Sequence, residues 1–187
     1  MCERACNRLI VLVLKKVKSM LRIRKADATN MNRIMEIYRI AQDFMIATGN
    51  PDQWGHFYPD EDLIHKDIEE QICHLICEGE KIHGVFALCK GEDPTYAQIF
   101  EGAWPNYEPY LTIHRIAGDG EAHGLLKCAA DYAKQLSDNV RIDTYKDNLI
   151  MQRQIEKNGF RQCGIIYLEN GSPRIAYQWT RKVFSDF

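Results

Sequence analysis

The chain has 187 residues, of which 45% are hydrophobic, and this is enough for one compact domain with its own core. Its 24 lysines and arginines nearly balance 26 aspartates and glutamates, and the formal net charge of −2 argues against nucleic acid as a partner. Only 12 glycines and 6 prolines are present, which argues against long linkers and low-complexity segments.

Cysteine usage indicates the compartment. The chain has seven cysteines, an odd number, and none stands in a Cys-x-x-Cys motif. Cys73 and Cys77 lie four apart in a predicted strand, where this spacing does not direct two thiolates to one metal ion. We therefore expect free, mostly buried thiols, no metal site and a reducing, cytoplasmic environment.

Residues 1–19 are predicted to be an extension ahead of a domain that spans residues 20–187. Leu9–Leu14 is apolar for only six residues and is followed by Lys15, Lys16 and Lys18. A signal peptide has its charges before a longer apolar core, and a membrane-spanning helix needs about 20 apolar residues. We expect neither, and no membrane partner. The extension is interpreted as an extra helix or as an upstream start.

The domain begins with a predicted strand over Leu21–Lys25, in which apolar and basic residues alternate. Apolar residues recur at helical spacing from Ile34 to Met45 and predict a helix that Asp27 or Thr29 caps. Gly49, Asn50 and Pro51 end this helix.

A second helix is predicted to start at Pro59 and to run to about Gln71. Its acidic residues predict a solvated helix face. These residues are Asp60, Glu61, Asp62, Asp67, Glu69 and Glu70. Two strands, His74–Glu78 and Ile82–Cys89, then form a predicted hairpin around Gly79.

The segment from Lys90 to Pro109 is a predicted loop with several aromatic residues, and long loops in compact domains are usually functional. Tyr110–Ala117 is the predicted central strand. Its apolar alternation slips by one residue near His114, which predicts a β-bulge, and bulges often lie beside active sites.

The remaining elements alternate between helix and strand, and the whole order predicts a mixed α/β sheet with helices on its faces. They are a helix over Gly124–Ser137, a strand over Asn139–Tyr145, a helix from Asp147 or Asn148 to Asn158 closed by Gly159, and strands over Phe160–Leu168 and Arg174–Trp179. Asn170-Gly171 between the last two strands is a typical hairpin turn.

Three stretches of sequence are informative together. They are IHRIA (Ile113–Ala117), RIDTYKDN (Arg141–Asn148) and IEKNGF (Ile155–Phe160). In this order and spacing, the chain from about Leu21 to Trp179 resembles the GNAT N-acetyltransferases. The stretches QWGHFYP (Gln53–Pro59) and GIIYLENGSPRIAYQ (Gly164–Gln178) favour a bacterial branch of that family.

The resemblance implies the GNAT fold, with a mixed, mostly antiparallel sheet of about seven strands and helices on both faces. It also implies an enzyme that transfers an acetyl group from acetyl-coenzyme A to a primary amine of a small molecule or peptide, by direct attack in a ternary complex. An alternative stays open, a non-catalytic protein of the same fold that binds coenzyme A or another small ligand. The oligomeric state stays open, and a homodimer is one alternative, because members of the family often dimerise through edge strands.

The cofactor site follows from the resemblance. A helix N-terminus offers backbone N–H donors and a favourable dipole to a pyrophosphate. The family's turn, Gln/Arg-x-x-Gly-x-Gly/Ala, corresponds to Glu121 through Leu126, where only Gly124 matches. Glu121 replaces the polar or basic residue and Leu126 the small one, while His123 and Lys127 would offset the lost cation.

The family's central strands also diverge at a wedge, where the backbone of Ile116 and Ala117 would pair with the pantetheine arm. Asn148 is either a helix cap or a cofactor contact. The predicted cofactor-binding residues are Ile116, Ala117, Glu121, Ala122, His123, Gly124, Leu125, Lys127 and Asn148.

Transfer requires a base for the amine and is helped by an acid for the leaving thiolate. The family's tyrosine acid corresponds to Ile155, which cannot donate, so Tyr145 or an unassisted thiolate takes its place. The candidate bases are His114, Glu101 and Asp143.

Each candidate base also has another interpretation. His114 could be a hydrogen-bonded core histidine, and Asp143 could pair with Arg141 or attract a cationic substrate. Glu101 lies in the aromatic loop and could hold an amine. The residues expected to wall the acceptor pocket are Gln53, Trp54, Tyr58, Arg174 and Tyr177.

Overall fold

The computed structural model describes residues 20–181. The predicted extension over residues 1–19 lies outside the described residues and stays a prediction. No helix within residues 20–181 is long and apolar enough to cross a membrane.

Seven strands of the described part of the chain form one sheet, in the order β1-β2-β3-β4-β5-β7-β6. The strands are β1 (Arg22–Lys25), β2 (Cys73–Glu78), β3 (Lys81–Lys90), β4 (Leu111–Gly118), β5 (Asn139–Thr144), β6 (Arg161–Tyr167) and β7 (Pro173–Thr180). Every neighbouring pair is antiparallel except β4 and β5, which run parallel. The predicted fold class is confirmed, and so is the predicted order of strands and helices.

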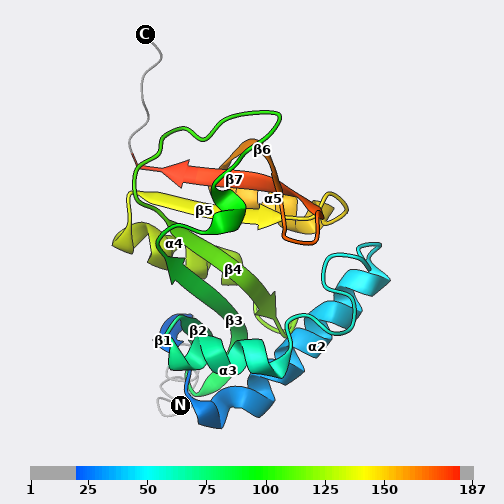
Figure 1. Ribbon diagram of the computed structural model, residues 1–187. Coiled ribbons are helices and arrows are strands. Elements are labelled where there is room, and N and C mark those ends of the chain that lie inside the picture. Colours follow the sequence, from blue (N-terminus) through cyan, green and yellow to red (C-terminus); the bar gives the residue numbers. More distant parts are fainter. Residues whose placement is uncertain (1–19, 182–187) are drawn as a thin grey trace, which may run out of the picture.

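Within residues 20–181, four α-helices cover the two faces of the sheet (Figure 1). They are α2 (Met31–Ala47) and α3 (Glu61–Glu69) on one face, and α4 (Leu125–Leu136) and α5 (Leu149–Lys157) on the other. Successive residues of β2 pack in different cores, because side chains along a strand point alternately to the two faces of the sheet. Leu75 packs in the cluster beneath α2 and α3, and Ile76 packs in the cluster beneath α4 and α5.

Beside α2 and α3, the same face of the sheet is covered by the aromatic loop, residues 91–110. Within it, a short 3-10 helix, η2 (Pro94–Tyr96), places Tyr96 in a buried cluster with Trp104 and with residues of β6 and β7. The Tyr96 and Trp104 rings stack at 5.6 Å between centroids. This segment is therefore an ordered cover and not an open loop.

The central strand bends at the predicted bulge. Ala87 of β3 pairs with His114, whereas Val85, two residues earlier, pairs with Ala117, so β4 has one extra residue here. Arg115, inside the bulge, has a φ of 52°, which is uncommon for a residue with a side chain. The bulge predicted near His114 is thus confirmed.

Beyond their first residues, β4 and β5 diverge, as Figure 1 shows. They pair only at Leu111 with Val140 and at Thr112 with Arg141. The later backbone groups on this edge of β4 face a wedge and not a neighbouring strand. This is the splayed arrangement that the resemblance implied.

Two details of the helices differ from prediction. Asp27 caps a short 3-10 turn, η1 (Ala28–Asn30), that leads into α2 and does not cap α2 itself. Asp67 does not belong to a solvated face, because it lies three residues after Ile64 and one before Ile68, and all three point toward the sheet. It is only 3% exposed.

The thiols agree with prediction within the described residues. Cys73, Cys77 and Cys163 are buried, Cys89 and Cys128 are partly buried, and all five are free.

Candidate active site

A cleft of about 1600 Å³ passes through the wedge between β4 and β5. On one side it opens toward the connection between α2 and α3, and we name this part the loop arm; its lining includes Trp54, Tyr58, Asp93, His114, Asp143 and Arg174. On the other side it follows the segment before α4, and we name this part the turn arm; its lining includes Gly120, Ala122, His123, Gly124, Leu125 and Lys127. Ile113, Ile142 and Thr144 line the wedge between them.

The turn arm ends at the N-terminus of α4. Gly124 starts this helix with a φ of 80°, and a side chain built on it would meet open space. The first turn of an α-helix leaves backbone N–H groups without partners inside the helix. Ile116 and Ala117, which were expected to pair with a pantetheine arm, line the adjoining part of the cleft.

The turn before α4 departs from the family's pattern at Glu121 and Leu126, and neither side chain blocks the backbone at the start of the helix. The Glu121 carboxylate lies 2.5 Å from the Lys81 ammonium and is not among the cleft-lining residues, so it points away from the turn arm. Leu126 is 8% exposed and packs in the core beneath α4. His123 and Lys127 line the cleft as expected, and so do Lys134 and Lys157.

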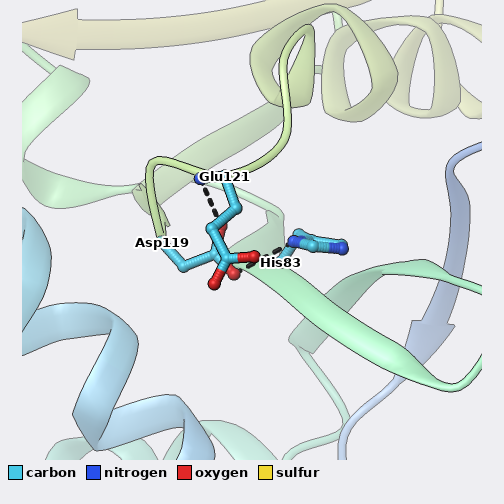
Figure 2. Close-up of side chains that lie close together, drawn as sticks. All are labelled: His83, Asp119 and Glu121. Carbon is cyan, nitrogen blue, oxygen red and sulfur yellow. Dashed lines mark hydrogen bonds and ion pairs between the residues drawn. The ribbon is translucent and has the colours of Figure 1, made fainter.

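Behind the turn, a buried carboxylate holds its first residues in place (Figure 2). Asp119 accepts hydrogen bonds from His83 Nδ1 at 3.0 Å and from Arg33 Nη2 at 2.6 Å. Its other oxygen accepts from the Glu121 backbone N–H at 3.0 Å. Ligand atoms of His83, Asp119 and Glu121 lie within 4.8 Å of one another, but Arg33 and Lys81 already neutralise the two carboxylates.

Asn148 caps α5, because its side chain accepts a hydrogen bond from the Met151 backbone N–H at 3.0 Å. Its amide nitrogen also donates to Gln53 Oε1 at 2.9 Å. Gln53 lies 95 residues earlier, in the segment between α2 and α3. Both residues line the cleft, so this hydrogen bond joins its two walls.

In the loop arm, His114 Nε2 lies 2.9 Å from Asp93 Oδ2, and the His114 side chain is 19% exposed. Burial alone would raise the pKa of Asp93, but hydrogen bonds from His114 and Thr95 outweigh it and lower that pKa to about 2. His114 therefore faces the cleft with an ionised carboxylate fixed on one ring nitrogen. This is the pairing that orients a histidine for proton transfer.

Asp143 also lines the loop arm, but its partners differ from the expected one. Tyr96 Oη donates to Asp143 Oδ1 at 2.6 Å, and Arg174 Nε lies 3.9 Å from Oδ2. Arg141 lies instead between the rings of Trp104 and Tyr110, at 3.8 and 3.7 Å from their centroids. The interpretation that Asp143 pairs with Arg141 is therefore wrong.

Besides Glu121, three predicted residues lie outside the cleft lining. Glu101 is exposed and follows Phe100, which pairs with Ile165 of the edge strand β6, two strands beyond β5. The Tyr145 ring packs against Arg174, whose guanidinium lies 4.9 Å from the ring centroid. Tyr177 is fully buried in the core beneath α4 and α5, where burial raises its pKa to about 12.

One ion pair in the cleft wall was not predicted. Arg115 Nη2 donates to both oxygens of Asp67, at 2.8 and 2.9 Å, and Arg115 Nε adds a bond at 3.1 Å. Tyr38 Oη donates to the Arg115 carbonyl oxygen at 3.1 Å. These contacts hold the bulge. The sequence signal that could have indicated this ion pair was the position of Asp67, at helical spacing among the buried residues of α3.

The Asp93 pairing has a consequence for stability. The pKa of Asp93 falls from 3.8 to about 2 in the folded state, so its contribution is present above pH 3.8 and is lost as the pH falls toward 2. Replacing Asp93 with asparagine is expected to remove about 2 kcal/mol of stability at neutral pH, with little effect at pH 2. Denaturant unfolding at the two pH values measures this; an equal loss at both would contradict it.

No family model matches the sequence, and no curated protein matches it. Solved structures do match. A GNAT-family acetyltransferase from Streptococcus agalactiae is 28% identical with a TM-score of 0.79, over 87% of this chain and 96% of its own. One from Listeria monocytogenes is 20% identical with a TM-score of 0.64, over 86% and 94% of the two chains.

A Bacillus subtilis acetyltransferase, solved in complex with coenzyme A, is 19% identical with a TM-score of 0.58, over 87% of this chain and all 100% of its own. Each of these matches covers 86% or 87% of this chain. Together with the bulged central strand, the wedge and the glycine turn before α4, they show that the chain has the fold of the GNAT-family acetyltransferases, and the 28% identical structure supports a GNAT-type N-acetyltransferase.

Proposed function

We propose that the protein transfers the acetyl group of acetyl-coenzyme A to a primary amine of a small molecule or peptide, by direct attack in a ternary complex. The observation that supports this most strongly is the continuity of the cleft. One space connects the His114–Asp93 pair with the glycine turn before α4, through the wedge between β4 and β5.

The turn arm suits the phosphates of coenzyme A. The start of α4 offers backbone donors and the positive end of a helix dipole, and Gly124 leaves room for a close approach. The same arm is lined by His123 and by Lys127, whose ammonium lies 2.6 Å from Asp131. From there, the free edge of β4 at Ile116 and Ala117 leads toward His114.

The loop arm suits an amine. Asp52, Asp93 and Asp143 line it, and a carboxylate-rich pocket favours a cationic group. Because Asp93 occupies Nε2 of His114, Nδ1 is the nitrogen that can take the proton from the attacking amine. Trp54 and Tyr58, whose rings meet edge to face at 6.3 Å, give this arm an apolar wall.

The first test is a calorimetric titration of the purified protein with acetyl-coenzyme A and with coenzyme A. Micromolar binding is expected, and a thiol-release screen over amines would then identify the acceptor. Absence of binding at millimolar concentration would contradict the proposal.

Replacing Gly124 with glutamate should weaken acetyl-coenzyme A binding by at least about tenfold, because it adds bulk and negative charge where the phosphates would lie. Gly79→Glu is the matched control. Gly79 also has a positive φ, of 59°, and open space around it, but it lies in the β2–β3 hairpin outside the cleft lining. Equal affinity of the two variants for acetyl-coenzyme A would show that the phosphates do not bind in the turn arm.

A non-catalytic coenzyme A-binding protein is the second candidate. The observation that favours it is Ile155, which is fully buried at the position of the family's tyrosine acid. Tight binding of acetyl-coenzyme A without thiol release to any amine would support it.

The expected partners and location also stay proposals. We propose a cytoplasmic enzyme that acts without nucleic acid or membrane partners. In a homodimer formed through edge strands, β1 is the available edge, since Phe100 already pairs with β6.

A further inference from the structure

Thr144, the last residue of β5, has a buried hydroxyl that the fold does not use. Three buried side-chain atoms lack a hydrogen-bond partner among residues 20–181: Asn50 Oδ1, Thr112 Oγ1 and Thr144 Oγ1. Of these three residues, only Thr144 lines the cleft. Buried polar groups are normally paired, so an unpaired one beside a ligand site needs an explanation.

The position of Thr144 in the strand gives its direction. Val140 and Ile142 pack in the core beneath α4 and α5, and side chains two residues apart on a strand share a face. Thr144 therefore faces the α5 side of the wedge. Ile155 of α5 packs in the same core as Ile142, so both residues belong to the face from which the family's tyrosine acid would act.

We propose that the Thr144 hydroxyl donates a hydrogen bond to the sulfur of the acyl donor and stabilises the leaving thiolate. This inference rests on the proposed function. The amine nitrogen forms a bond to the acetyl carbon and gives a proton to His114, and the carbon–sulfur bond then breaks. Sulfur leaves with the electron pair. Thr144 keeps its own proton, and water protonates the released thiolate.

A hydrogen bond without proton transfer is chemically sufficient here. A thiol has an ordinary pKa near 8.5, so its thiolate is a far weaker base than the alkoxide of threonine would be. Hydrogen bonds to charged acceptors are stronger than neutral ones, and burial strengthens them further. The hydroxyl thus stabilises the sulfur more strongly in the transition state, where the carbon–sulfur bond is stretched, than in the bound thioester. This difference is what accelerates a reaction.

The test compares Thr144→Val with Thr112→Val, the matched control. Both changes remove an unpartnered, buried hydroxyl from a strand and keep the shape of the side chain, so neither should lower the unfolding midpoint. Thr144→Val should lower kcat about tenfold with the amine found in the thiol-release screen. Thr112→Val should leave kcat unchanged, and Thr144→Ser should restore most of the activity.

A second measurement needs no amine. The ultraviolet absorbance of the thiolate is followed while coenzyme A, bound to the protein, is titrated with base. The thiol should ionise at a pH about one unit lower in the wild type than in Thr144→Val. His114, Asp93, Asp143 and Arg174 also face the wedge or the loop arm, but they are the same in both proteins and cancel in the comparison.

The outcomes separate the two proposals. If coenzyme A does not bind the wild type, the proposed function and this inference both fail. If coenzyme A binds and its thiol ionises at the same pH in the wild type and in Thr144→Val, only the role of Thr144 is overturned. Equal affinity of dethio-coenzyme A, which lacks the sulfur, for both proteins is the expected control result.

Discussion

Replacing Asp67 with alanine is expected to lower the free energy of unfolding by about 3–5 kcal/mol, because it leaves the Arg115 guanidinium buried without its partner. The side chains of Asp67 and Arg115 are only 4% and 12% exposed, and three hydrogen bonds join them. Burial raises the pKa of Asp67, and the Arg115 guanidinium offsets only part of this rise. Removing either side chain therefore leaves the charge of the other one buried without a partner.

The matched control is Asp131→Ala. Asp131 also forms a carboxylate–cation pair, with Lys127 at 2.6 Å, but the two side chains are 49% and 68% exposed. Exposed pairs of this kind contribute about 1 kcal/mol or less. Urea unfolding of both variants measures the difference, and equal losses would show that the Asp67–Arg115 pair is hydrated and weak.

The same ion pair also connects stability with the site. Arg115 directly follows His114 and has a positive φ of 52°, which costs free energy in any residue with a side chain. Asp67 of α3 holds its guanidinium, and Tyr38 of α2 holds its carbonyl oxygen. Helices α2 and α3 thus fix the bulge that directs His114. Asp67→Ala should lower turnover even where the protein remains folded.

Much of the fold could be predicted because its signals are local. The Asn148 cap, the Asn170-Gly171 hairpin and the bulge near His114 each depend on a few neighbouring residues. The wedge was expected only through the family resemblance. The pattern of alternation within β4 does not say where β5 stops pairing with it.

The pairs that build the site could not be predicted, because each joins distant elements. Asp93 and His114 are 21 residues apart, Asp67 and Arg115 are 48 apart, and Gln53 and Asn148 are 95 apart. The sequence shows that these side chains are polar. Only the packing of α3, the aromatic loop and α5 against the sheet brings each to its partner.

One error was avoidable. Arg174 and Tyr177 were both assigned to the acceptor wall, although they are three residues apart on one strand and must face opposite sides. Arg174 lines the cleft, whereas Tyr177 packs with Ile175 and Trp179 in the opposite core. Glu101 differs, since its position depends on how the aromatic loop passes the edge of β6.

Replacing His114 with alanine is expected to lower kcat about 100-fold, with little change in the affinity for acetyl-coenzyme A, if His114 is the base. A histidine base accepts a proton only when it is neutral, so turnover of the wild type should rise with pH. The variant should lose this rise. Asp93→Asn, which keeps an acceptor for Nε2 but removes its charge, should give an intermediate kcat.

His74→Ala separates this role from that of an ordinary core histidine. His74 is 5% exposed on β2, stacks on Phe86 at 5.3 Å between ring centroids, and does not line the cleft. Its loss should lower stability and leave the pH profile of turnover unchanged. If His114→Ala behaves in the same way, His114 is a core residue, and Asp143 becomes the base, since it is the remaining predicted carboxylate that lines the cleft.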